Sequence, residues 1–319
     1  MKLHAPFVQL PILFDALQLA EEIGSLDKDS WRPHPQNFPG NSMMPLVAVD
    51  GDPGNEGFAG PMRPTPQLAA LPYLQQVLAS LGATVGRTRL MRLSGQAEVT
   101  RHADQHYYWT ERVRVHVPVV TQPTVRFECG DAGLNMAPGE CWIFDTWRQH
   151  RVLNADDRPR IHLVCDTVGG AEFWKMVYRG RPVGIAADSP GWTAQTLEYA
   201  ASSPPPIPFE NYNLPQVMSP WELERHLDFL VEEMIPSPHQ ITIHRHVRML
   251  YHAWRGLWAA HADAAQAVPE YRRLLDGFLA QVKPMAGESM LRNELSMLPA
   301  LMSGIARVAV LGHAEDRLG

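Results

Sequence analysis

The spacing of apolar residues changes along the N-terminal part of the chain. Residues 7–26 begin with an apolar run and continue with apolar residues at helical spacing, so they predict a short strand followed by a helix. Residues 33–67 are rich in Pro, Gly, Asn and Asp and predict long loops. Residues 68–81 show helical periodicity again, which Gly82 ends.

Short alternating segments follow between residues 85 and 166, separated by Gly, Pro, Asn and Asp. In residues 112–119, valines occupy every second position, while Arg112, Arg114 and His116 share the opposite face. Three more segments have strand character: 124–128, 140–145 and 160–166. Closely spaced strands of this kind are typical of an antiparallel barrel or sandwich.

The C-terminal part has a different pattern. Residues 203–208 are rich in proline and predict a stiff connector. Four segments beyond it have apolar residues at helical spacing: 221–234, 241–261, 270–282 and 290–310. We therefore expect a mainly β domain with N-terminal helices and loops in residues 1–185, and a helical region in residues 209–319.

Composition narrows the classes of function. With 319 residues, 45% of them hydrophobic, the chain can bury a sizeable core. A net charge of −6 gives no general attraction to nucleic acid or to anionic lipid, so we expect neither as a partner. We also expect no membrane span and no signal peptide. The three cysteines have no paired spacing and favour a reducing, cytoplasmic location. A homo-oligomer is left open.

The segment His102-Ala103-Asp104 can supply two metal ligands. On an extended segment, side chains two residues apart point the same way, so His102 and Asp104 can converge on one ion. His150, shortly after the predicted strand 140–145, can supply a second imidazole. Two imidazoles and one carboxylate on one face of a metal are typical of non-haem Fe(II) oxygenases.

Two other triplets have the same spacing, His261-Ala262-Asp263 and His313-Ala314-Glu315. The first lies at the end of a predicted helix, where residues two apart do not face each other. The second lies in a charged tail. Spacing alone does not choose among the three triplets, but only His102-Ala103-Asp104 lies among alternating strands.

Several arginines near these residues can bind an anion. Arg160 lies ten residues after His150 and shares a strand face with His162, and Arg114 and His116 form a second cationic pair. The planar guanidinium fork suits carboxylates. The alternative reading is a charged, solvated sheet face.

Three segments together resemble the aspartyl/asparaginyl β-hydroxylase family, which includes bacterial proline cis-hydroxylases. They are TRLMRLSGQAEVTRH, RHADQHYYWTERVRVHVPV and PGECWIFDTWRQHRVLNADDRPRIHLVCD, and the resemblance covers residues 46–166. It implies a double-stranded β-helix (jelly-roll) core. It also implies an enzyme that uses Fe(II), O2 and 2-oxoglutarate to hydroxylate a C–H bond, with succinate and CO2 as co-products.

The resemblance also implies roles for individual residues. The metal ligands and catalytic residues would be His102, Asp104 and His150. Arg160 would pair with the distal carboxylate of 2-oxoglutarate, while Arg114 and His116 would lie near its metal-chelating end. Members of the family that modify protein domains in animals lack the carboxylate ligand, so Asp104 indicates the bacterial branch. Met91 stands where family members can place a serine that helps to bind 2-oxoglutarate.

The resemblance to the bacterial branch suggests a small carboxylate-bearing substrate, a free amino acid or a derivative. Arg112 shares the cationic face and is not needed for 2-oxoglutarate, so we expect it to bind the substrate. Three further candidate substrate residues are Tyr108, Trp109 and Asn55. The alternatives are hydroxylation of peptidyl Asp or Asn, another oxidation such as desaturation, and a non-catalytic jelly-roll protein that binds a metal or a small acid.

Overall fold

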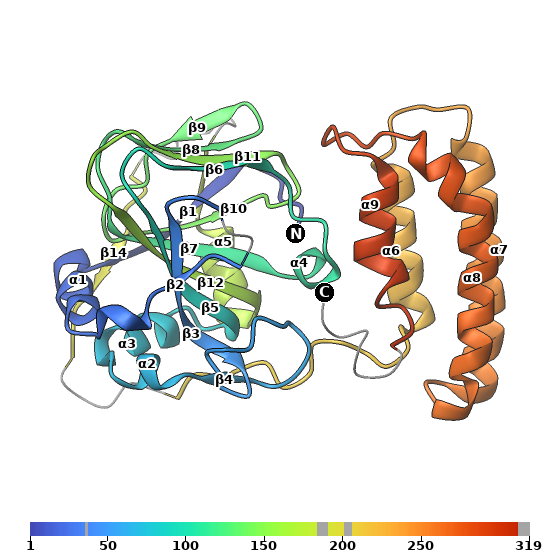
Figure 1. Cartoon of the computed structure of the whole chain (residues 1–319), viewed down its shortest axis with the longest axis horizontal. Helices are drawn as coiled ribbons and strands as arrows, with labels where there is room; N and C mark the ends of the chain where they lie inside the picture. Colours follow the sequence, from blue (N-terminus) through green and yellow to red (C-terminus); the bar gives the residue numbers. More distant parts are fainter. Residues whose placement is uncertain (36–37, 184–190, 201–205, 312–319) are drawn as a thin grey trace. The chain divides into compact units, whose positions relative to one another are not determined.

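The computed structural model describes residues 1–35, 38–183, 191–200 and 206–311 (Figure 1). The chain divides into two compact units. Unit 1 comprises Met1–Asp104 and Glu111–Asn213, and unit 2 comprises Gln105–Thr110 and the chain from Leu214 onward. Unit 1 thus continues past the predicted boundary at residue 185. The assignment of residues 105–110 to unit 2 has no counterpart in the sequence pattern.

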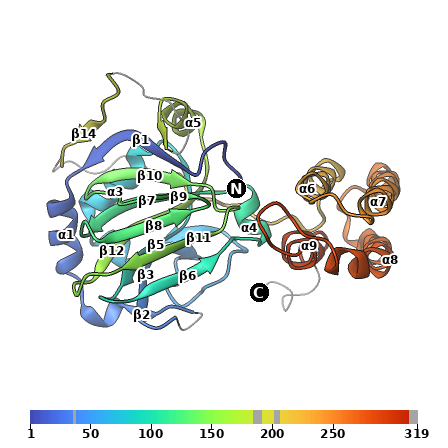
Figure 2. The same cartoon turned by 90° about the horizontal axis from the view of Figure 1, so that it is seen from above.

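Unit 1 is a double-stranded β-helix, as expected, built from a larger and a smaller sheet (Figures 1 and 2). The larger sheet has the strand order β13-β1-β10-β7-β12-β5-β3-β2, with β14 paired to β1 and β4 paired to β3. Its strands are β1 (Phe7–Phe14), β2 (Arg32–Pro33), β3 (Asn41–Val49), β4 (Met62–Pro64), β5 (Thr84–Leu93), β7 (Val113–Val120), β10 (Glu140–Phe144), β12 (Arg160–Gly169), β13 (Arg181–Val183) and β14 (Gln195–Leu197). The smaller sheet has the order β6-β11-β8-β9 and contains β6 (Glu98–His102), β8 (Val125–Cys129), β9 (Ala132–Leu134) and β11 (His150–Asn154).

Alternation along β7 separates the two faces of the larger sheet. Val115 and Val117 are buried, and α1 packs on this strand. Because successive side chains of a strand point to opposite faces, Arg114 and His116 lie on the other face. The helices of unit 1 are α1 (Ala16–Gly24), α2 (Pro66–Ala69), α3 (Pro72–Ser80) and α5 (Ala171–Tyr178), with a 3-10 turn at Lys28–Ser30.

An apolar cluster fills part of unit 1 with side chains from both sheets. Its buried aromatic members are Phe7, Phe127, Trp142 and Phe144. The rings of Phe127 and Phe144 lie 4.8 Å apart, and Phe7 meets Phe127 edge-on at 5.5 Å. Because Phe127 comes from β8 while Phe144 comes from β10, these contacts fix the spacing of the two sheets.

Unit 2 is helical. Its helices are α4 (Tyr107–Thr110), α6 (Pro220–Glu232), α7 (Gln240–His261), α8 (Val268–Gly287) and α9 (Met297–Leu301), followed by a π-helical turn at Met302–Ala306. Helices α6, α7 and α8 pack in sequence order (Figure 2). Trp254 of α7 lies at their core, 4.7 Å from the ring of Tyr271, and its indole N–H donates to the carbonyl of Met218. No helix in the described part of the chain is long and apolar enough to cross a membrane.

Two sequence predictions are wrong in detail. Residues 33–67 contain strand β3, which is buried on both faces and interrupted by Pro45, so it lacks the alternation that marks a half-buried strand. Residues 290–310 do not form one helix, because the chain turns at Glu294, which has a φ of +67°, and Ser296 caps the short helix α9. Residues 203–205 of the predicted connector and the triplet at His313 lie outside the described residues.

Candidate metal centre

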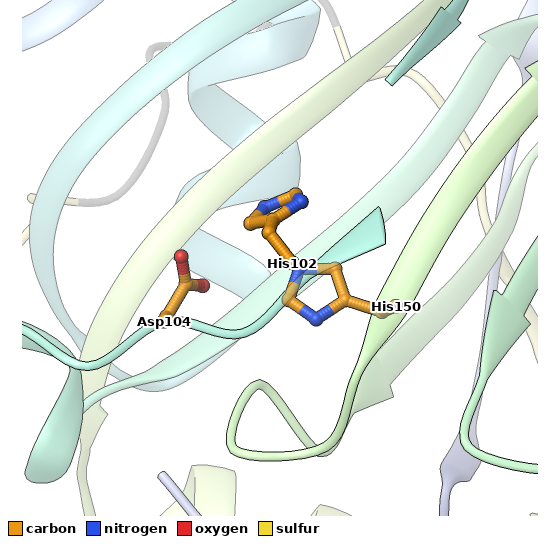
Figure 3. Close-up of side chains that lie close together, drawn as sticks. All are labelled: His102, Asp104 and His150. Atoms are coloured by element: carbon orange, nitrogen blue, oxygen red, sulfur yellow. The ribbon is translucent and has the colours of Figure 1, made fainter. Parts of the chain in front are cut away.

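Strand pairing brings together the three residues with metal-ligating side chains. His102 ends β6 and His150 begins β11, and the two residues are direct partners in the smaller sheet. Asp104 follows two residues later, and its backbone N–H donates to the carbonyl of Thr146. One ligand atom of each residue lies within 4.8 Å of the other two (Figure 3).

Backbone carbonyls orient both imidazoles. Nδ1 of His102 lies 2.7 Å from the carbonyl oxygen of Thr100, and Nδ1 of His150 lies 2.9 Å from that of Arg148. Because a carbonyl only accepts, each Nδ1 carries the proton, and each Nε2 keeps its lone pair for a metal. This is the arrangement that metal-binding histidines use to fix their tautomer.

The charges favour ligand binding at neutral pH. Burial lowers the pKa of His150 to about 4, so its imidazole is neutral. Burial alone would raise the pKa of Asp104, but the guanidinium of Arg114, 3.0 Å away, and the two histidines outweigh it and lower that pKa. The site therefore presents two imidazoles, of which that of His150 is neutral, and one carboxylate, a donor set that fits Fe(II).

Asp145 supports the turn before His150. Its carboxylate accepts from the backbone N–H of Trp147 and from Nε of Arg148, each at 3.0 Å. The carbonyl of Arg148 in turn accepts from His150. Asp145 therefore caps this turn and acts on His150 through the backbone.

A row of rings in successive contact extends from His150 to His162, which contacts Arg160. Phe144 lies 4.8 Å from the ring of His150, His116 lies 5.3 Å from Phe144, and His162 lies 5.8 Å from His116. The guanidinium of Arg160 reaches Nδ1 of His162 at 2.6 Å. His150 of the smaller sheet thus lies close to the predicted anion residues of the larger sheet, inside unit 1.

Near Arg160, this row of rings contains buried polar atoms without a hydrogen-bond partner among the described residues. They are Nε of Arg160, Nε2 of His162 and both ring nitrogens of His116. Burial lowers the pKa of Arg160 to about 9, which leaves it protonated at neutral pH, and also lowers the pKa values of His116 and His162. A buried cation with an unused donor, next to neutral imidazoles, fits the distal carboxylate of 2-oxoglutarate.

Arg114 lies between two carboxylates. It pairs with Asp104 at 3.0 Å and with Asp166 at 2.9 Å. Arg114 is therefore beside the candidate metal ligand Asp104. Its contacts in this structure are carboxylates of the chain itself.

Arg112 is not the spare cation that the sequence suggested, and a role for it in substrate binding stays a prediction. Its guanidinium forms a bidentate pair with Glu210, at 2.8 and 3.1 Å, and both side chains are buried. Glu210 lies 98 residues later in the chain, outside the segment that carries the resemblance. Arg112 thus ties the start of β7 to the segment that contains Glu210.

Three other candidate substrate residues have defined local roles. Tyr108 and Trp109 belong to α4 in unit 2, where their rings meet edge-on at 5.9 Å and Tyr108 is buried. The side-chain oxygen of Asn55 accepts from the N–H of Gly57 in a tight turn. A role in substrate binding stays a prediction for all three.

The structure adds charged residues on β5 that the sequence reasoning missed. Arg87 packs over the ring of Phe58 at 4.2 Å and lies 3.8 Å from Asp166, while Arg89 is buried on the same strand face. Alternation would have been the signal, because Arg87, Arg89 and Met91 are two residues apart.

One known protein family matches the segment that carries the candidate metal ligands. Residues 55–169 match the family model described as aspartyl/asparaginyl beta-hydroxylase, and the match includes His102, Asp104, His150 and Arg160. This match agrees with the resemblance of residues 46–166 to the same family, and we call residues 55–169 the β-hydroxylase domain. The expected family and hydroxylase class are therefore confirmed. The donor set of this β-hydroxylase domain agrees with the expected Fe(II), 2-oxoglutarate and O2.

The β-hydroxylase domain also has distant likenesses among solved structures. An oxidoreductase of the 2OG-Fe(II) oxygenase family from Burkholderia pseudomallei is 15% identical, with a TM-score of 0.35 over 52% of this chain and 87% of that one. A prolyl-4-hydroxylase from Pseudomonas putida is 17% identical, with a TM-score of 0.33 over 51% of this chain and 92% of that one. No curated protein matches the chain. The assignment of the β-hydroxylase domain rests on the family match.

Proposed function

We propose that this protein is an Fe(II)- and 2-oxoglutarate-dependent dioxygenase. Its substrate is a small carboxylate-bearing molecule, a free amino acid or amino-acid derivative, and the reaction hydroxylates one C–H bond. The observation that carries the proposal is the convergence of His102, Asp104 and His150 with both histidine Nε2 atoms left for a metal. These three residues are the metal ligands and the catalytic residues of the proposal.

The overall reaction balances with O2 as the oxidant. One oxygen atom of O2 enters the substrate as a hydroxyl group, and the other enters succinate as 2-oxoglutarate loses CO2. Bound Fe(II) supplies the activation of O2.

The residues of the chain bind and orient the reactants. Arg160, hydrogen-bonded to His162, holds the distal carboxylate of 2-oxoglutarate, while Arg114 and His116 lie near its metal-chelating end. Arg114 keeps Asp104 ionised and in place through its ion pair. Phe127 and Phe144 pack against His116 at 5.3 Å and help to exclude water from this end of the site.

The choice of a small substrate rests on Asp104. The resemblance links a carboxylate ligand with the bacterial branch, and a ligand set of this kind supports hydroxylation of a free molecule over modification of a protein domain. Three free, buried cysteines support a cytoplasmic location: Cys129, Cys141 and Cys165. These statements stay predictions, as does the absence of a nucleic-acid partner.

The test is a substrate screen with purified protein, Fe(II), 2-oxoglutarate and O2. The panel contains free amino acids, N-acyl amino acids and short peptides with Asp or Asn. We expect a free amino acid or a derivative to gain the mass of one oxygen while an equal amount of succinate forms. Oxygen gained only by the peptides would favour the peptidyl hydroxylase, and a loss of two hydrogens would indicate desaturation. Binding of Fe(II) and 2-oxoglutarate without succinate, with every member of the panel, would favour a non-catalytic binding protein.

A further inference from the structure

Arg89 differs from the other arginines buried in unit 1. Among the described residues, its side chain makes one hydrogen bond, to the sulfur of Met43 at 3.6 Å, and forms no ion pair with a carboxylate. Arg112 pairs with Glu210, and Arg114 pairs with Asp104. Arg160 also lacks a carboxylate partner in the described chain, but the proposed function assigns it to 2-oxoglutarate.

The sheet register puts Arg89 on the face of the metal site. Arg89 on β5 is the partner of Val164 on β12, and Val164 is the partner of His116 on β7. Side chains that are direct partners in a sheet point to the same face, and two strand spacings measure about 10 Å. Arg89 therefore faces the same interior as His116 and is separated from it by the Val164 side chain.

Arg89 stays charged at neutral pH. Burial and the neighbouring Arg87 lower its pKa to about 9, while the carboxylates of Asp166 and Glu56 raise it from beyond ion-pair distance. A buried cation without a direct ion-pair partner is costly, and an anionic ligand removes that cost. The two carboxylates of 2-oxoglutarate are already assigned, one to Arg160 and one to the metal side, so the anion left for Arg89 is a second carboxylate.

We propose that Arg89 binds the carboxylate of the substrate and so selects acids over their amides. The inference rests on the proposed function, because it takes the metal ligands and Arg160 as assigned there. Arg89 takes the role that the sequence suggested for Arg112. Glu210 neutralises Arg112, whereas Arg89 faces the interior that contains His116. Arg89 is then a residue that sets specificity, in direct contact with the substrate.

The experiment compares acids with their amides. Protein loaded with Mn(II) and 2-oxoglutarate under nitrogen is titrated calorimetrically with the twenty free L-amino acids, their N-acetyl derivatives and the primary amide of each. We expect at least one acid to bind the parent protein on the order of a hundredfold more tightly than its amide. Arg89→Met should weaken this acid to the level of the amide. Affinity for 2-oxoglutarate should change less than about twofold, because Arg160 is untouched.

Two further variants separate a binding role from a structural one. Arg89→Lys keeps the charge but loses the fork, and should regain part of the preference for the acid. Arg92→Met is the matched control, since Arg92 lies on the opposite face of β5, stacked over Trp31 at 4.3 Å and bonded to Ser42. It should bind the acid as the parent does. Melting curves for every variant show whether a loss of binding follows a loss of fold.

Three results would overturn the role of Arg89: equal affinity of the parent for acids and amides, unchanged acid binding in Arg89→Met, or no acid of the panel bound. A failure of the proposed function is seen separately, as the absence of O2-dependent succinate formation with Fe(II) in every condition. If the parent protein forms succinate and Arg89→Met oxidises the substrate at the normal rate, only the role of Arg89 is rejected.

Discussion

The tripeptide His-Ala-Asp occurs at residues 102–104 and again at residues 261–263, with different results. At the end of β6, His102 and Asp104 point toward each other and toward His150 (Figure 3). At the end of α7, His261 and Asp263 are exposed, and Ala262 between them has a φ of +48°. The same three residues therefore make a candidate metal site in one place and a helix end in the other.

Two features distinguish the first site from the second. The extended backbone turns both side chains of residues 102–104 to one side, and strand pairing supplies His150 as the third ligand. A carbonyl from the same strand also fixes the proton of His102 on Nδ1. A spacing motif thus becomes a metal site through its backbone conformation and its neighbours across the sheet.

The largest expected effect on activity comes from the three candidate metal ligands. Changing His102, Asp104 or His150 singly to Ala should abolish succinate formation, because each change removes one ligand of a three-residue site. The protein should still melt cooperatively, since the apolar cluster around Phe127 is untouched.

The second triplet supplies the matched controls. His261→Ala and Asp263→Ala remove the same residue types from an exposed position and should leave activity within about twofold of the parent. Full activity in Asp104→Ala without an added carboxylate would rule out the ligand assignment. A large loss of activity in His261→Ala would show that the second triplet is also needed for catalysis.

Arg160 should give the next largest effect. Arg160→Met removes a buried cation facing the proposed 2-oxoglutarate site, so the concentration of 2-oxoglutarate needed for half-maximal rate should rise on the order of a hundredfold. Lysine at this position should restore part of the affinity.

Arg158→Met is the control for Arg160. Arg158 lies two residues earlier, its side chain is 69% exposed, and it pairs with Asp156. Its loss should not change the 2-oxoglutarate requirement. If Arg160→Met bound 2-oxoglutarate as tightly as the parent under nitrogen, the anion would have to bind elsewhere.

How far the sequence predicts the fold depends on how each strand is buried. The valines of β7 alternate with charged residues, so this strand and its charged face were predictable. Strand β3 is buried at every position except Ser42 and contains Pro45, so no alternation marks it. Strand β11 has alternating burial, but His150 and Asn154 are among its buried residues, and polar residues at buried positions hide that pattern.

The candidate site was predictable where local spacing decides it. His102 and Asp104 follow from the geometry of an extended segment, and Arg160 and His116 from the resemblance. The partner of Arg112 was not predictable, because Glu210 meets it only through the tertiary fold across 98 residues of sequence. Arg89 was not predictable from alternation alone, because β5 carries Arg87 and Arg89 on one face and Arg92 on the other.

The Arg112–Glu210 pair gives a prediction about stability. Arg112→Met leaves the buried carboxylate of Glu210 without its bidentate partner, which should lower the free energy of unfolding by about 3–5 kcal/mol. The double variant Arg112→Met/Glu210→Gln should recover much of this loss, since no unpaired charge remains. Denaturant melts measure both quantities.

An exposed pair provides the contrast for Arg112. Arg126 pairs with Glu128, but its side chain is 56% exposed, so Arg126→Met should cost less than about 1 kcal/mol. Unchanged stability in Arg112→Met, together with a raised substrate requirement, would instead restore Arg112 as a substrate residue.

The smallest expected effect concerns the residues directly after the first triplet. Residues 105–110 belong to unit 2, where the hydroxyl of Tyr107 donates to Glu222 and the hydroxyl of Ser303 donates to the carbonyl of Gln105. Because Gln105 is bonded covalently to Asp104, contacts within unit 2 restrict the backbone at the carboxylate ligand. Tyr107→Phe removes one hydrogen bond, worth about 1 kcal/mol, and should weaken Fe(II) binding by a few-fold at most. Tyr178→Phe is the matched control, since Tyr178 is 91% exposed and should change nothing. Equilibrium titration with Fe(II) under nitrogen measures the effect. A lower melting temperature for Tyr107→Phe with unchanged Fe(II) affinity would mean that this contact stabilises unit 2 without positioning Asp104.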